Sequence, residues 1–380
     1  MKEIVFSKEK IVTGRGSLAA LSCFFEKKVM IVTGGQSMFR TGVIERAEKI
    51  LEENHCRVSV YSGISKNPTT TQIISGLKEM KTFQPEVVVA VGGGSPIDAA
   101  KVMTLFYEHS EFNFDNVFGN LNLPKKLNTI FVAVPSTSGT ASEVTQVSVV
   151  TIAETREKKA IKTEAIRPDI AILDGDLPDT LPDHIVAETG MDALTHALEA
   201  YINKNGNDFT DAMAKEAIEG LLEYLPSSFT EGDRLSREKV HNYQCMAGMA
   251  FSNSGLGMVH GVSHAFGGIY DMAHGLANAI ILPYSMDYNK KDPMVRKKYD
   301  RLSKAIGKDI IEAVRELQKK LDIPESFAKA GITEEDYKDK YEIICTFSMR
   351  GSTAVNPVIV SEDDMKKFVD CVYYGKTVDF

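Results

Sequence analysis

The chain has 380 residues and a formal net charge of −8. One hydrophobic core seldom supports this length, so we expect two domains. With 43% hydrophobic and 25% charged residues, the composition is that of a folded protein and excludes extensive disorder. The negative charge excludes a general attraction to nucleic acid or to an anionic membrane, because phosphate groups favour clustered lysine and arginine.

The cellular location is inferred from the N-terminus and the cysteines. The first residues, MKEIVFSKEKIVTG, lack the unbroken apolar run of a signal peptide, and no stretch approaches the ~20 apolar residues of a membrane span. The cysteines are odd in number, far apart and without a C-x-x-C pair, which predicts reduced thiols in a cytoplasmic protein. They are Cys23, Cys56, Cys245, Cys345 and Cys371.

Five short runs rich in β-branched residues mark the first half of the chain. Apolar runs of this kind are typical of strands buried on both faces, and the helical patterns between them suit crossover connections. The runs predict strands at residues 29–33, 57–61, 86–91, 129–134 and 169–174. We therefore expect an α/β domain with a mostly parallel sheet.

Beyond Pro182 long helical patterns replace the strands. Glycine and proline are confined to the joints between them, as expected of a helical domain. The patterns predict helices at residues 185–202, 209–225, 237–253, 255–268 and 274–288. We place the boundary near residue 183, with an α/β domain over residues 1–183 and an all-helical domain over residues 184–380.

A glycine-rich turn follows the third predicted strand. Gly92, Gly93, Gly94 and Ser95 open a helix that also carries Asp98. Glycines let backbone N–H groups approach a phosphate, and the helix N-terminus favours an anion. A tight turn that binds nothing is an equally good interpretation of this motif alone, which is not the G-x-G-x-x-G fingerprint of a standard Rossmann fold.

Two more polar segments follow predicted strands. Gly34 and Gly35 end the first strand, where a dinucleotide site often places an acidic residue for the ribose hydroxyls. Residues 135–145, PSTSGTASEVT, supply small hydroxyl side chains after another strand. By itself the latter segment is better explained as a polar loop.

Histidines gather in the second half of the chain. Asp192 and His196 are four residues apart in a predicted helix, so both face one side of it and can reach one ion. His260, His264 and His274 fall within fifteen residues of each other. A lone histidine is usually a packing or surface residue, but this cluster favours a metal site.

These segments together resemble the iron-dependent (group III) alcohol dehydrogenases, a family that includes lactaldehyde reductase and 1,3-propanediol dehydrogenase. Four motifs in order carry the resemblance over nearly the whole chain: GGGSPxD at 92–98, PxTxGTxxEVT at 135–145, GxDALxHAxE at 190–199, and the 260–274 histidine segment. It implies a dinucleotide-binding α/β domain followed by an all-α metal-binding domain, an architecture also found in dehydroquinate synthase. It also implies a homodimer or larger homo-oligomer.

The resemblance assigns roles to individual residues. The metal ligands fall on Asp192, His196, His260 and His274. His264 falls beside the nicotinamide, where it is a candidate proton relay or, equally, a residue that only packs beside the site. The pyrophosphate turn falls on Gly92, Gly93, Gly94 and Ser95, with Asp98 close by. Contacts to the adenosine and ribose fall on Thr137, Ser138, Thr140 and Lys158.

The implied reaction is reversible hydride transfer between NAD(P)H and a short-chain aldehyde. A site of one carboxylate and three imidazoles suits Fe²⁺ or Zn²⁺ with a position open for the aldehyde oxygen; family habit favours Fe²⁺. Many members carry aspartate at the position of Gly34, where it repels the 2′-phosphate of NADP. Glycine removes that repulsion, so both NAD(H) and NADP(H) remain open.

The substrate is less constrained. Arg350 lies six residues before Asn356, in a loop that lines the substrate pocket of the family, and Gln146 and Ser254 are further candidate contacts. Arginine beside a small polar pocket suits an anionic aldehyde such as sulfoacetaldehyde. A solvated Arg350, with neutral substrates of the butanol, 1,3-propanediol or lactaldehyde type, is the alternative.

Three rival functions are open to simple tests. A metal-dependent cyclase or polyol-phosphate dehydrogenase of the same architecture should show other metal-ligand patterns. A nucleotide- and metal-binding sensor would not oxidise NADH when an aldehyde is added. An interaction scaffold would leave the clustered histidines unexplained. We therefore expect an enzyme whose partners are small molecules, without nucleic acid or membrane.

Overall fold

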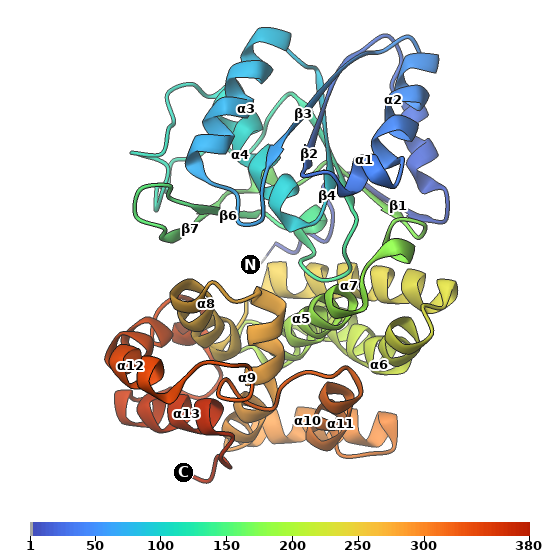
Figure 1. Ribbon diagram of the computed structural model, residues 1–380. Helices are drawn as coiled ribbons and strands as arrows, with labels where there is room; N and C mark the ends of the chain where they lie inside the picture. Colours follow the sequence, from blue (N-terminus) through green and yellow to red (C-terminus); the bar gives the residue numbers. More distant parts are fainter. Residues whose placement is uncertain (1–2) are drawn as a thin grey trace. The chain divides into compact units, whose positions relative to one another are not determined.

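The computed structural model describes residues 3–380, which form two compact units (Figure 1). Unit 1 extends to Thr180 and unit 2 covers Leu181–Phe380. Unit 1 is built on a parallel sheet and unit 2 on helices alone, which confirms the predicted fold class.

The main sheet of unit 1 has six parallel strands in the order β1-β8-β5-β4-β2-β3. Five of them were predicted: β2 (Lys28–Gly34), β3 (Arg57–Ile64), β4 (Val87–Gly92), β5 (Ile130–Pro135) and β8 (Ile170–Asp174). The edge strand β1 (Lys10–Gly14) was not, because its five residues carry only two large apolar side chains. An antiparallel ribbon of β6 (Val147–Thr151) and β7 (Lys158–Lys162) was also not predicted.

Alternating side chains of the central strands build two separate cores. Met30 of β2 and Val88 of β4 pack with α3 (Thr70–Phe83) and α4 (Gly94–Glu108). Ile31 and Val89, one residue further along each strand, pack on the other face with α1 (Ser37–Arg40), α2 (Val43–Glu53) and a 3₁₀ turn at Ser17–Cys23. Since neighbouring residues point to opposite faces, a strand covered on both sides is apolar throughout.

Unit 2 contains nine α-helices among the described residues. They are α5 (Asp183–Ile202), α6 (Asp208–Thr230), α7 (Arg234–Ser254), α8 (Met258–Tyr270), α9 (His274–Asn289), α10 (Pro293–Ile306), α11 (Ile310–Lys320), α12 (Glu334–Ser348) and α13 (Glu362–Tyr374). Side-chain caps start six of them, at Asn207, Asp233, Asp292, Asp309, Thr333 and Ser361. In residues 3–380 no helix has the length and apolar character needed to cross a membrane.

Glycine brings two of these helices close together. A Cβ on Gly275 would collide with the carbonyl oxygen of Glu188 and lie 3.4 Å from the Cβ of Asp192. The first turn of α9 therefore lies directly against α5, which places His274 beside Asp192.

Candidate functional site

The carboxyl ends of β2, β4 and β5 lie side by side in unit 1. Thr33 is in register with Val91, and Gly92 with Pro135. The polar segments that follow these strands therefore meet at one edge of the sheet, where open α/β sheets bind their ligands.

The glycine turn after β4 presents a bare helix N-terminus. Gly92 has φ +142°, and Gly93 precedes α4 without a capping side chain. A Cβ on Gly93 would lie 3.3 Å from Thr137 Oγ1, and one on Gly94 would lie 2.9 Å from Thr140 Oγ1. The structure thus brings two predicted threonines against the predicted phosphate turn, whose helix N-terminus has no side-chain cap from Gly93.

Asn67 connects two predicted cofactor residues and was missed by sequence reasoning. Its backbone N–H donates to Ser95 Oγ at 3.3 Å, and its side-chain Oδ1 accepts from Lys158 Nζ at 3.0 Å. It has φ +57° in the loop between β3 and α3. A lone Asn-Pro pair after a strand gives only a turn signal, so the sequence did not single it out.

Asp98 and Lys101 fasten the 142–149 loop to α4. Asp98 accepts from Ser142 Oγ at 2.5 Å and from the N–H of Val149 at 2.8 Å, while Lys101 Nζ donates to Ser142 Oγ at 2.8 Å. Burial lowers the pKa of Lys101 to about 8, although Asp98 opposes the shift. Both oxygens of Asp98 are engaged by protein groups, so its contribution to the turn is to hold the loop.

The other predicted residues of unit 1 lie in the same loops. Gly35 has φ +54°, directly after β2. Ser138 is buried in the loop that connects β5 to β6, and Gln146 is half-buried just before β6.

The predicted metal ligands of unit 2 come from three helices. Asp192 and His196 lie on α5, His260 on α8, and His274 at the start of α9. Asp192 Oδ1 lies 3.8 Å from His196 Nε2, 4.0 Å from His260 Nε2 and 3.8 Å from His274 Nε2. Three imidazole nitrogens therefore lie within 4.0 Å of one carboxylate oxygen.

Asn278 provides a test of whether a cation fits this volume. Its Nδ2 donates to Asp192 Oδ1 at 2.7 Å and lies 3.2 Å from His260 Nε2 and 3.1 Å from His274 Nε2. An amide nitrogen has two hydrogens for these three acceptors. Ligand atoms of Asp192, His260 and His274 also lie within 4.8 Å of one another. The donor set and its convergence fit a divalent ion of the Fe²⁺ or Zn²⁺ type.

Burial and charge favour the same conclusion. Asp192 is 3% exposed, and burial raises its pKa. Burial, and then the charges of His196 and His264, lower the pKa of His260. Neutral histidines are the form that binds a metal, and a cation compensates a buried carboxylate.

His196 and His264 occupy different positions in the cluster. His196 is buried, and its ring stacks between His260 at 4.7 Å and Phe251 at 4.4 Å. His264 is exposed on α8, one turn beyond His260, with its ring stacked on His274 at 5.2 Å. His264 is therefore accessible to solvent beside His274, whereas His196 is enclosed.

Supporting side chains around the ligands were also missed. Glu199 Oε2 lies 2.6 Å from His260 Nδ1, and Ser263 Oγ lies 3.2 Å from His274 Nδ1. Burial raises the pKa of Glu199 to about 7. Asn278 follows His274 by four residues and Glu199 follows His196 by three, so helical spacing was a signal that could have found both.

The candidate substrate residues of unit 2 are less clearly placed. Ser254 is buried at the end of α7, where its hydroxyl donates back to Ala250 at 3.1 Å. Arg350 is exposed, with its guanidinium 4.6 Å from the centre of the Phe347 ring. It immediately precedes a 3₁₀ turn (Gly351–Val355). This turn packs closely on α8: a Cβ on Gly261 of α8 would collide with Thr353 of the turn.

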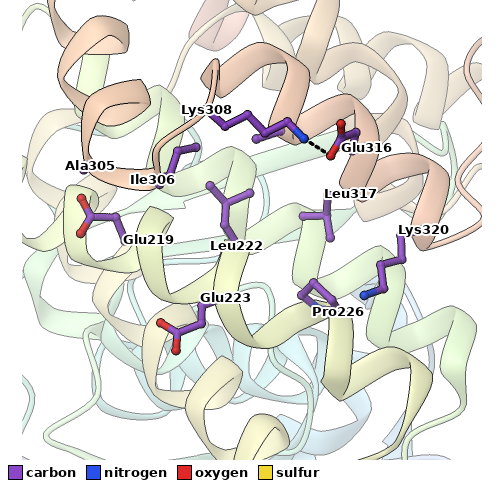
Figure 2. A pocket seen from close by; sticks show the side chains of 11 residues that line it. Glu219, Leu222, Glu223, Pro226, Ala305, Ile306, Lys308, Glu316, Leu317 and Lys320 are labelled. Carbon is purple, nitrogen blue, oxygen red and sulfur yellow. Dashed lines mark ion pairs between the residues drawn. The ribbon is translucent and has the colours of Figure 1, made fainter.

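A pocket of about 490 Å³ lies elsewhere in unit 2 (Figure 2). Leu222 of α6 and Leu317 of α11 form part of its wall, and Lys308 pairs with Glu316 at its edge. It shares no lining residue with the metal group. The histidine cluster therefore remains the candidate site.

Known proteins match the chain over both units. The family described as iron-containing alcohol dehydrogenase matches residues 8–175, and its C-terminal counterpart matches residues 186–373. The NADPH-dependent butanol dehydrogenase of Clostridium saccharobutylicum is 41% identical over 97% of this chain and 98% of its own.

Solved structures agree. An iron-containing alcohol dehydrogenase from Thermococcus thioreducens superposes with a TM-score of 0.92 at 35% identity, covering 99% of this chain and 100% of its own. A sulfoacetaldehyde reductase from Bifidobacterium kashiwanohense, in complex with NAD⁺, gives 0.88 at 25% identity, covering 98% of both chains. These matches confirm the resemblance seen in the motifs. The chain therefore belongs to the iron-containing alcohol dehydrogenase family and is an enzyme of that family.

Proposed function

We propose that this enzyme interconverts short-chain aldehydes and primary alcohols, R-CHO + NAD(P)H + H⁺ giving R-CH₂OH + NAD(P)⁺. The observation that carries the proposal is the convergence of Asp192, His260 and His274, whose ligand atoms lie within 4.8 Å of one another. His196 Nε2 lies 3.8 Å from the same oxygen of Asp192. These four residues would hold one divalent ion, with Fe²⁺ favoured and Zn²⁺ the alternative.

Each partner has a separate chemical task. A divalent ion in this cluster supplies a Lewis acid for a carbonyl oxygen, and a reduced nicotinamide supplies hydride. Asp192 and His196 of α5 and His260 of α8 are buried away from bulk water, which strengthens electrostatic interactions there. His264, exposed beside His274, is positioned to pass a proton between the product oxygen and solvent.

The cofactor would bind along the strand ends of unit 1. The N–H groups of Gly93, Gly94 and Ser95 suit the pyrophosphate. Thr137, Ser138, Thr140 and Lys158 would contact the adenosine and ribose.

Gly34 supports use of NADPH as well as NADH. It offers no carboxylate to repel a 2′-phosphate, and a Cβ there would lie 2.7 Å from the carbonyl oxygen of Ile64. The surrounding backbone is therefore packed for glycine, and the Clostridium relative is named as NADPH-dependent.

Neutral aldehydes such as butanal are the first choice of substrate, because the butanol dehydrogenase is similar over nearly the whole chain. The test is an aldehyde panel, neutral and anionic, with NADH and NADPH on protein loaded with Fe²⁺ or Zn²⁺. We expect oxidation of the reduced cofactor on adding butanal. Failure with every aldehyde, metal and cofactor would contradict the proposal.

An anionic aldehyde such as sulfoacetaldehyde is the second candidate, favoured by exposed Arg350 in the loop against α8. If Arg350 binds the anion, Arg350→Ala should lower kcat/KM for sulfoacetaldehyde about tenfold, a loss of ~1.4 kcal/mol, and spare propanal. Equal effects on both aldehydes would exclude this role.

We also propose a cytoplasmic homodimer or larger homo-oligomer. All five cysteines are free thiols, which suits a reducing compartment. Light scattering of the purified enzyme measures the assembly; a monomeric mass would contradict it.

A further inference from the structure

The start of α8 is held by two side chains from elsewhere in unit 2. Its N-cap residue, Gly257, has no side chain to accept from the first turn. Instead, Asn356 Oδ1 accepts from the N–H of Met258 at 3.2 Å, and Glu199 Oε1 accepts from the N–H of Val259 at 2.7 Å. A Cβ on Gly257 would lie 2.8 Å from Glu199 Oε1 and 3.0 Å from Asn356 Oδ1, so glycine makes room for both acceptors.

The second oxygen of Glu199 meets the next residue of α8. Oε2 lies 2.6 Å from Nδ1 of His260, and both side chains are buried, with 3% and 2% of their surfaces exposed. One carboxylate therefore contacts both the backbone of the helix start and the imidazole of a proposed metal ligand.

We propose that Glu199 is a positioning residue that fixes the tautomer of His260. Burial opposes the ionised form of Glu199, but the N–H of Val259 and the dipole of α8 point toward its carboxylate and favour the anion. An ionised Glu199 is an acceptor only, so Nδ1 carries the hydrogen. Nε2 is then left with its lone pair directed toward Asp192, as a metal ligand requires.

The opposite arrangement has a different chemical consequence. A neutral Glu199 that donated to Nδ1 would leave the hydrogen on Nε2, where it would block metal binding. Glutamine mimics that neutral acid in shape and in donating an N–H. The substitution Glu199→Gln therefore separates the two arrangements while nearly preserving side-chain volume.

The inference rests on the proposed metal site, and Co²⁺ binding to metal-free enzyme tests the two separately. With Co²⁺ absorption as the readout, we expect Glu199→Gln to weaken binding roughly ten- to a hundredfold, the usual cost of losing such a partner. Its Co²⁺ spectrum should resemble that of His260→Ala, because both lose the same ligand.

A double variant distinguishes positioning from a general structural role. If Glu199 acts through His260, adding Glu199→Gln to His260→Ala should change Co²⁺ affinity less than about threefold. Full additivity of the two losses would overturn the inference, and so would a Glu199→Gln enzyme that binds Co²⁺ like the wild type.

Asn356→Ala is the matched control. It removes the other acceptor of the same helix start but leaves the contact between Glu199 and His260 in place. We expect a lower Tm and Co²⁺ affinity within about threefold of wild type; a loss as large as that of Glu199→Gln would overturn the inference. Wild-type enzyme that binds no Co²⁺ would overturn the proposed metal site as well.

Discussion

The phosphate turn of unit 1 and the histidine cluster of unit 2 are built from different parts of the chain. In unit 1 the candidate contacts are backbone N–H groups of Gly93, Gly94 and Ser95, which lack partners within the helix because α4 begins there. In unit 2 they are side chains of three helices, held in place by Glu199, Ser263 and Asn278. Damage to one site should therefore leave binding at the other intact.

The largest effect is expected from a substitution in the metal cluster that lowers activity but spares cofactor binding. Asp192→Asn replaces the one carboxylate that all three histidines approach. Loss of a Lewis acid worth ~4 kcal/mol should lower kcat/KM for butanal about a thousandfold. NADH binding, measured by nucleotide fluorescence, should stay within about twofold of wild type; loss of both together would break the comparison.

Acid should destabilise unit 2 through protonation of His241, a fully buried residue of α7. Burial lowers its pKa from 6.5 to about 4. The unfolded imidazole binds a proton below pH 6.5 and the folded one only near pH 4, so unfolding takes up a proton in this window. The free energy of unfolding is therefore not reduced by His241 above pH 6.5, and it falls by up to about 3 kcal/mol as the pH drops to 4.

The control for His241 is the variant His241→Gln, which lacks this titration. Hydrogen exchange of α7 between pH 6.5 and 4 should rise less in the variant than in wild type, after correction for intrinsic rates. The unit 1 histidines, His55 and His109, are exposed or half-buried. An identical pH dependence in wild type and variant would contradict the role of His241.

Gly93→Ala is the converse test: it should damage the phosphate turn of unit 1 and leave the metal cluster of unit 2 intact. Its Cβ would lie 3.3 Å from Thr137 Oγ1, within the proposed phosphate turn. Crowding of about 1–3 kcal/mol should weaken NADH binding about ten- to a hundredfold. Co²⁺ affinity should not change. Unimpaired NADH binding would remove this turn from the cofactor site.

Gly34→Asp should produce the smallest effect, which appears only in the ratio of kcat/KM with NADPH to kcat/KM with NADH. The clash with the Ile64 carbonyl affects both cofactors, but a new carboxylate repels only the 2′-phosphate. At about 1 kcal/mol for a solvated charge contact, the preference for NADPH over NADH should fall about fivefold in kcat/KM. An unchanged ratio would place the ribose away from Gly34.

The sequence predicted the elements whose pattern is local. The apolar runs at 86–91 and 129–134 became β4 and β5 because both faces of each strand are covered. The ribbon β6–β7 was missed because Lys158 and Lys159 open β7, and only one residue of β7 is buried, so the strand has no apolar run. Helix α8 starts at Met258 rather than at 255, since Gly255 has φ +97° and the N–H groups of Met258 and Val259 donate to the side chains of two distant residues.

The same contrast holds for the sites. The glycine turn is contiguous in sequence and follows a strand, so the motif predicted its place in the fold, although a turn that binds nothing was an equal interpretation. Asn67 and Ser95 are 28 residues apart, and Glu199 and His260 are 61 apart. Their contacts depend on how distant segments pack, which spacing along one helix or strand does not reveal.

The most direct test of the proposed function is an anaerobic Fe²⁺ titration of metal-free enzyme, followed by NADPH oxidation with butanal. The proposed cluster predicts activity that rises linearly and saturates at one ion per chain, and no such rise in Asp192→Asn. Full activity without added metal, or the same titration curve in both proteins, would contradict it.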